Sequence, residues 1–255
     1  METIIIPIEK VKMNNPILIE GLPGIGNVGR VAAGYLINEL GMKKIAELYS
    51  RHFWPLVVLH PDSTVTPLKN EFYHHKGEKN DIIIFTGDTQ SVTPDGHYEI
   101  CEKVLEFCQT NGIKMIITLG GFAEGKELTE PKIIGAVNDK KLVEKYKDFG
   151  IDFGKDHPTG TIIGASGLLI GMARLKNIDA ICLMGQTVGM PGLTDPKAAD
   201  NILHTLSKIL NLKLDLTKLE KAIEEIDEQL KKAEKIQKQV NQHSKPSKEE
   251  TRYIG

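Results

Sequence analysis

The amino-acid sequence predicts an α/β protein with a three-layer body, in which a central, mostly parallel or mixed sheet is flanked by helices, and with a C-terminal helical extension. Two observations support this prediction. Short β-branched runs alternate with stretches of helical periodicity over about 210 residues, which is the pattern of α/β folds. Several of these runs are also apolar at every position, as expected for strands that helices cover on both faces.

The expected strands are short, and most of them end in glycine-rich turns. They cover residues 17–19, 56–59, 82–85, 115–119, 133–137 and 181–183. The turns contain Gly21, Gly87, Gly120, Gly121 and Gly185. Because α/β folds place ligands at the carboxyl ends of parallel strands, these turns are where a site is expected.

Four segments space their apolar residues as helices do, at residues 27–41, 97–110, 165–175 and 197–210. Asn27 is the expected N-cap of the first helix, and Gly41 is its expected C-terminal stop. Pro196 suits the first turn of the last helix. The third helix is apolar almost all round, so we expect it to be buried.

The composition changes after residue 212, which divides the chain into a body at 1–212, a helical appendage at 213–241 and a flexible tail at 242–255. In the appendage, apolar residues recur at spacings of three, four and seven, so it either pairs with a partner helix or packs back on the body. The polar tail ends in Tyr253, Ile254 and Gly255. These terminal residues are candidates for binding a partner, with a frayed end as the alternative.

The composition also excludes several classes of protein. Lys and Arg number 32 and Asp and Glu number 34, so the formal net charge of −2 argues against a nucleic-acid partner. The apolar runs are too short for a membrane span, and the N-terminal segment lacks the features of a signal peptide. Three cysteines without a C-x-x-C motif fit a reducing, cytoplasmic compartment. The histidines lack the spacing of metal ligands, so we expect neither a metal nor a cofactor.

The sharpest local motif is the glycine-rich turn after the first expected strand. Gly24, Gly26 and Gly29 match the G-x-G-x-x-G spacing that brings backbone N–H groups close to a pyrophosphate. Pro23 makes this turn longer than the usual dinucleotide fingerprint, and Glu47 is the only acidic candidate for the ribose. We therefore prefer a tight turn with close helix–strand packing.

The turns together predict a polar ligand pocket at one edge of the sheet. Its candidate residues are Gly24, Gly26, Asn27, Gly29, Asp88, Gln90, Gly120 and Gly121. Asp88 is suited either to act as a general base in this pocket or to cap a loop. Ser166 lies in a turn that is close to a nucleophile elbow, but Leu168 replaces the last glycine of that motif and no triad is evident.

Five motifs, taken in order, resemble the archaeal proteasome assembly chaperone family. They are the run from Ile19 to Arg30, Phe53-Trp54-Pro55, the strand that ends in Gly87-Asp88-Thr89-Gln90, the turn from Ile117 to Phe122, and the helix start from Gly164 to Leu169. The resemblance covers about residues 1–215. It implies a body related in fold to the purine nucleoside phosphorylases.

The resemblance also implies a function. A member of this family is expected to be a non-enzymatic homo-oligomer, a trimer or tetramer, that helps to assemble the proteasome core particle by binding its α-type subunits. Proteasome-docking tails often end in a hydrophobic residue, tyrosine and any one residue. Tyr253 is instead third from last, which moves the terminal carboxylate outward by one residue.

Two alternatives from other classes remain open at this point. One is an enzyme of the nucleoside phosphorylase or hydrolase kind, and the other is a small-molecule sensor. Both would use a pocket near Gly24, Asp88 and Gly121. The sequence offers Arg30 and Asp88 for phosphorylase chemistry but no further catalytic set, so we predict no catalytic residues.

Overall fold

The structure, a computed structural model, describes residues 2–126, 128–154, 160–190, 193–217, 219 and 221. One compact unit of the chain runs from Met1 to Asp215. The predicted appendage at 213–241, beyond its first few positions, and the predicted tail at 242–255 lie outside the described residues. Both stay predictions.

The described chain alternates strands and helices. Its strands are β1 (Ile4–Pro7), β2 (Ile17–Glu20), β3 (Lys43–Tyr49), β4 (Val57–Leu59), β5 (Val65–Pro67), β6 (Asn70–His75), β7 (Ile82–Gly87), β8 (Met115–Ala123), β9 (Ile133–Val137), β10 (Ile151–Asp152) and β11 (Asp179–Thr187). Its helices are α1 (Val28–Glu39), α2 (Pro94–Thr110), α3 (Lys141–Tyr146), α4 (Ala165–Leu175) and α5 (Pro196–Leu210), with short 3-10 turns at Ile25–Asn27 and Lys147–Phe149.

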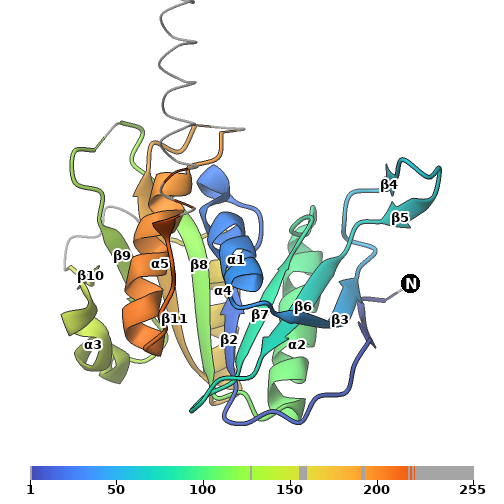
Figure 1. Ribbon diagram of the computed structural model, residues 1–255, viewed down its shortest axis with the longest axis horizontal. Coiled ribbons are helices and arrows are strands. Elements are labelled where there is room, and N and C mark those ends of the chain that lie inside the picture. The colour runs from blue at the N-terminus through green and yellow to red at the C-terminus, as the bar shows by residue number, and fades with distance from the viewer. Residues whose placement is uncertain are drawn as a thin grey trace, which may run out of the picture. The chain divides into compact units, whose positions relative to one another are not determined.

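The central sheet has nine strands in the order β1-β3-β6-β7-β2-β8-β11-β9-β10. The four middle strands, β7, β2, β8 and β11, are parallel, and the antiparallel pairs β6–β7 and β11–β9 flank them. Helices α1 and α5 lie side by side on one face, while α2 and α4 cover the other (Figure 1). The predicted fold class, a mixed sheet flanked by helices, is confirmed.

The hydrophobic core lies on both faces of the middle strands. Those strands carry fully buried Leu18, Ile83 and Ile116, which explains why stretches of them, such as residues 82–85, are apolar at every position. Helix α2 turns Val104 and Leu105 toward the sheet. The burial of each of these side chains stabilises the folded state by about 2 kcal/mol. The core therefore fixes the middle strands and the turns that follow them.

The helix ends follow local chemistry in two places and depart from it in one. Asp195 caps α5 by accepting a 3.0 Å hydrogen bond from the Ala198 N–H, and Pro196 occupies the first turn as predicted. Thr93 caps α2, which begins at Pro94, three residues before the predicted start. Asn27 is the N-cap residue of α1 as predicted, but its side chain makes no capping bond and its backbone is left-handed, with φ at 48°.

The prediction of a central strand at residues 56–59 is wrong in its placement. This segment forms β4, which pairs only with β5 in a separate two-stranded hairpin. The hairpin projects from the edge of the body (Figure 1), and Leu59 is 71% exposed. The sequence pattern did not predict the outer strands β1, β3 and β6. In β3 and β6, polar side chains interrupt the apolar run, and β1 is a four-residue segment that ends in Pro7.

Candidate functional site

The expected site lies between the loops that follow β2 and β7, which lead to opposite faces of the sheet. These two strands are parallel neighbours, but the loop after β2 leads to α1 on one face and the loop after β7 leads to α2 on the other (Figure 1). Such a reversal opens a crevice at the carboxyl end of a sheet, where α/β proteins bind ligands. A hollow of about 550 Å³ occupies this crevice.

Both loops and one aromatic residue line the hollow, which we call the switch-point pocket. The loop after β2 contributes Pro23, Gly24 and Asn27, the loop after β7 contributes residues 88–92, and Trp54 completes the lining. Four of the eight candidate residues therefore meet here: Gly24, Asn27, Asp88 and Gln90. The other four, namely Gly26, Gly29, Gly120 and Gly121, are not among its lining residues.

Glycines outside the pocket allow close packing of the backbone. A Cβ atom on Gly29 would lie 2.3 Å from the Leu119 carbonyl oxygen, and one on Gly121 would lie 2.3 Å from the Ile25 carbonyl oxygen. Gly29 thus allows α1 to pack closely against β8. Close helix–strand packing accounts for Gly29 and Gly121, in line with the interpretation preferred from the sequence.

Gln90 joins three parts of the site. Its Nε2 donates a 2.7 Å hydrogen bond to the Pro23 carbonyl, and its Oε1 accepts a 2.9 Å bond from the Ala165 N–H at the start of α4. A Cβ atom on Gly164, whose φ is 91°, would lie 2.7 Å from that Oε1. The amide of Gln90 is therefore a structural clamp, and its polar atoms are already used.

Asp88 holds the loop in which it lies. Its Oδ2 accepts a 3.0 Å hydrogen bond from the Lys69 N–H, and its own N–H donates a 3.0 Å bond to the Lys69 carbonyl. Of the two roles that the sequence left open, this geometry favours the loop cap. It leaves Oδ1 without a hydrogen-bond partner among the described residues.

A buried carboxyl group, not predicted as a site residue from the sequence, lies at the end of β2 directly before the glycine-rich turn. Glu20, fully buried at the end of β2, accepts a 3.0 Å hydrogen bond from the Leu22 N–H and a 2.9 Å bond from the Ser166 hydroxyl. Burial raises the pKa of Glu20 to about 7, against the opposite effect of these two bonds. One feature of the sequence could have indicated this group: an acidic residue ends an apolar strand directly before a glycine-rich turn.

Ser166 does not have the surroundings of a nucleophile. Its hydroxyl hydrogen-bonds to Glu20, and the Leu119 carbonyl is the alternative acceptor at 3.4 Å. The histidines at 97 and 52 have other surroundings: His97 lines a different hollow, and the His52 ring bonds to Thr93. The described residues thus give Ser166 a structural partner and no general base of the serine-hydrolase kind.

Two further candidates from the sequence fall outside the pocket. Glu47, considered for a ribose, lies within β3 and forms ion pairs with Lys44 and Lys69. Burial alone would raise the pKa of Glu47, but hydrogen bonds from Lys44, Lys69 and Tyr49 outweigh it and lower that pKa to about 2. Arg30, considered for phosphate, is exposed on α1 and does not line the pocket.

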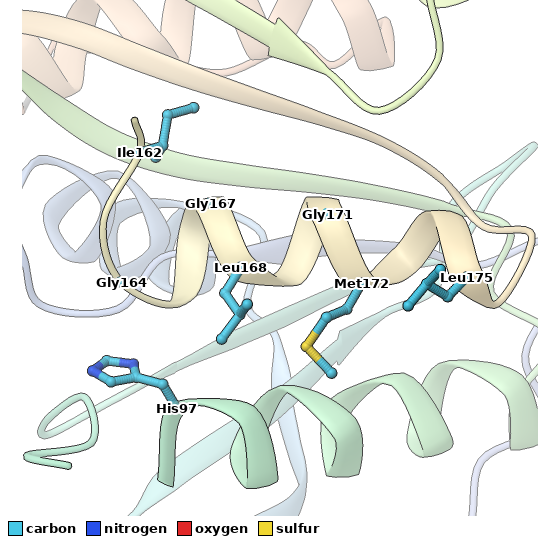
Figure 2. Close-up of a pocket in the computed structure, with 8 residues that line it drawn as sticks. All are labelled: His97, Ile162, Gly164, Gly167, Leu168, Gly171, Met172 and Leu175. Carbon is cyan, nitrogen blue, oxygen red and sulfur yellow. The ribbon is translucent and has the colours of Figure 1, made fainter. Parts of the chain in front are cut away.

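A second hollow, of about 460 Å³, lies between α2 and α4. Figure 2 shows Leu168 and Met172 pointing from α4 toward α2, with His97 at the start of α2. The α4 side of this groove also carries Gly167 and Gly171, and Leu175 is 80% exposed at its end. The groove is largely apolar and contains none of the pocket residues predicted from the sequence.

Within the described part of the chain, no group of three His, Cys, Asp or Glu side chains is arranged to hold a metal ion. None of the described helices has the length and apolar character needed to cross a membrane.

These features define an α/β body with a polar crevice at its switch point and a largely apolar groove between α2 and α4. The chain belongs to the PAC2 family, whose model matches residues 18–234. It is 39% identical to the Methanocaldococcus jannaschii protein MJ1210 over 95% of this chain and 93% of that protein.

Two solved structures from Pyrococcus furiosus resemble this chain. PbaB, an archaeal proteasome activator, is 41% identical, with a TM-score of 0.86 over 91% of this chain and 99% of that chain. PbaA, an archaeal homologue of proteasome-assembly chaperone, is 28% identical, with a TM-score of 0.78 over 95% of this chain and 96% of that chain. The family resemblance seen in the sequence motifs is confirmed.

Proposed function

We propose that the protein is an assembly chaperone of the proteasome core particle, which binds α-type subunits through a homo-oligomeric body and its C-terminal extension. The observation that carries this proposal is the similarity to PbaA and PbaB over more than nine tenths of the chain. A trimer or tetramer would present several extensions at once, and multivalency raises affinity without new contacts. The cytoplasmic location is part of the same proposal.

The surface of the body supports a role in protein binding. Apolar side chains at the hairpin of β4 and β5 are exposed, among them Trp54 at 59%, Leu56 at 52% and Leu59 at 71%. Side chains of β1, on the edge of the sheet, add Ile4 and Ile6 at 40% and 45%. Clustered exposed apolar residues of this kind are typical of protein–protein contacts.

Activation of the assembled core particle is a second candidate function. The specific observation in its favour is that PbaB, an archaeal proteasome activator, has higher identity and a higher TM-score than PbaA. Both functions require binding to the core particle or its subunits. They differ in whether the bound species is a subunit intermediate or the finished particle.

One experiment tests the proposal and separates the two functions. The full chain is mixed with separate α-type and β-type subunits or with the finished core particle, and we measure binding, the rate of particle formation and peptide hydrolysis. A chaperone accelerates particle formation, whereas an activator increases hydrolysis by the finished particle. Binding to neither species would refute both functions.

Two truncations locate the contact. Deleting residues 253–255 tests the terminal docking residues, and ending the chain at Leu212 removes the whole extension. We expect the first deletion to weaken binding and the second to abolish it; full binding by the shorter chain would place recognition on the body instead. Incubation of the protein with nucleosides and phosphate tests the enzymatic alternative, since turnover above background would contradict a non-enzymatic role.

A further inference from the structure

The switch-point pocket has a rigid floor. Gln90 ties the loop after β2 to the start of α4 through Pro23 and Ala165, and Asp88 ties the loop after β7 to the backbone of Lys69. Both loops are therefore held in place before any ligand arrives. A preformed hollow loses less conformational freedom on binding than mobile loops do.

One wall of the pocket is a flat aromatic surface. Trp54 is the only tryptophan of the sequence. It lines the pocket instead of packing in the core, and 59% of it is exposed. Its indole N–H has no hydrogen-bond partner among the described residues. An exposed indole of this kind offers a face for a planar or cationic group.

The charges of the side chains that line the pocket indicate which class of ligand it can bind. Asp88 contributes a carboxylate whose Oδ1 accepts no bond within the described chain, and none of the nine described residues that line the pocket is Lys, Arg or His. A phosphate would meet this carboxylate without a compensating cation, so the pocket is unsuited to it. A cationic donor has the complementary charge.

We propose that the switch-point pocket binds an arginine side chain of a partner polypeptide, with the guanidinium group stacked on Trp54 and hydrogen-bonded to Asp88. A guanidinium group is planar, is always charged and carries five N–H donors, so it fits an aromatic face beside an acceptor. The exposed Leu56, two residues after Trp54, offers an apolar surface for residues that flank the arginine. This inference rests on the proposed function only in taking the ligand to be a protein.

The single tryptophan allows a direct test with the full chain. Trp54 fluorescence is titrated with a blocked leucine–arginine–leucine tripeptide and with the same peptide carrying citrulline, the uncharged analogue of arginine. We expect a saturable change with the arginine peptide and affinity for the citrulline peptide that is about tenfold lower, since a charge-assisted hydrogen bond is lost. Equal affinities, or no saturable change with the arginine peptide, would overturn the proposal.

Matched variants assign the effect to the pocket. In Asp88→Asn the amide oxygen still accepts from the Lys69 N–H while the charge is removed, so we expect about tenfold weaker binding of the arginine peptide. Asp62→Asn is the control, because Asp62 also accepts a backbone N–H, that of Thr64, but lies in the turn between β4 and β5 outside the pocket. Equal losses in both variants would refute the pocket as the site.

Uncharged adenosine provides a further arm of the test. Tighter binding of adenosine than of the arginine peptide would assign the pocket to a nucleoside and overturn the proposal. Because these titrations contain no proteasome, their result stands apart from the subunit-binding experiment, and either proposal can fail without the other.

Discussion

The hydroxyl group of Ser166 donates a 2.9 Å hydrogen bond to the carboxyl group of Glu20, although 146 residues separate them in the chain. This bond joins the end of β2, at the centre of the sheet, to the first turn of α4. The same carboxyl group accepts the Leu22 N–H and so also shapes the glycine turn. The pair therefore ties the end of β2, and the turn that follows it, to α4.

The buried carboxyl group predicts a dependence of stability on pH. Because burial raises the pKa of Glu20 from 4.5 to about 7 in the folded state, the native protein keeps a proton that the unfolded chain releases between these values. The contribution of Glu20 to the free energy of unfolding is thus complete below pH 4.5. It is lost as the pH rises to about 7, by about 3 kcal/mol in total.

Urea unfolding of the wild type and of Glu20→Gln across this window measures that contribution. The uncharged amide still accepts from Leu22, so we expect the variant to lack this loss and to be more stable than the wild type above pH 7. The same decline with pH in both proteins would contradict the prediction.

The close contact of α1 with β8 predicts opposite effects at two glycines of one helix. Gly29→Ala places a Cβ atom 2.3 Å from the Leu119 carbonyl oxygen, so we expect the free energy of unfolding to fall by about 3 kcal/mol. Gly34→Ala is the control, because a Cβ atom there meets nothing within 4 Å. It should raise stability by about 0.5 kcal/mol through helix propensity. Chemical denaturation measures both, and equal effects would refute the packing argument.

The hydrogen bonds of Gln90 predict that the stability of the fold depends on a single atom of its side chain. Gln90→Glu replaces the donating Nε2 with an oxygen that faces the Pro23 carbonyl, so we expect a loss of about 2 kcal/mol at neutral pH. Gln109→Glu, at an exposed position near the end of α2, is the matched control. A loss of similar size in the control would show that the added charge, and not the clamp, causes the effect.

The three cysteines are predicted to be unreactive in the folded protein. Cys101, Cys108 and Cys182 are buried, and burial raises the pKa of the Cys101 and Cys182 thiols to about 12. Thiol-specific reagents should therefore label them only as the protein unfolds. Labelling of the native protein at the rate of a free thiol, measured by absorbance, would contradict this assignment.

The exposed hairpin of β4 and β5 predicts that a charge placed on it weakens association with other proteins but leaves the stability of the fold unchanged. We expect Leu59→Asp to weaken self-association or proteasome binding, because it places a charge at a 71% exposed apolar position, while the thermal midpoint stays unchanged. Leu175→Asp, at an 80% exposed leucine of α4, is the control. Light scattering and binding assays compare the two, and unchanged association in Leu59→Asp would exclude the hairpin.

The sequence alone determined the middle of the fold. Strands such as 82–85 are apolar at every position because helices cover both faces, and that burial leaves a local pattern that can be recognised. Pro196 marked the start of α5 for a similar reason, because its effect on the backbone is local. The order of motifs indicated the family, since it depends on no contact between them.

Only the tertiary structure determined which residues come together at the site. The bonds of Glu20 with Ser166 and of Gln90 with Ala165 join residues far apart in sequence, and no periodicity encodes such a pair. The same limit explains the misplaced strand at 56–59, because an apolar run has the same pattern whether it is buried in the sheet or exposed in a hairpin. Local patterns report which residues favour burial, whereas the partner of each buried group is fixed only when the chain folds.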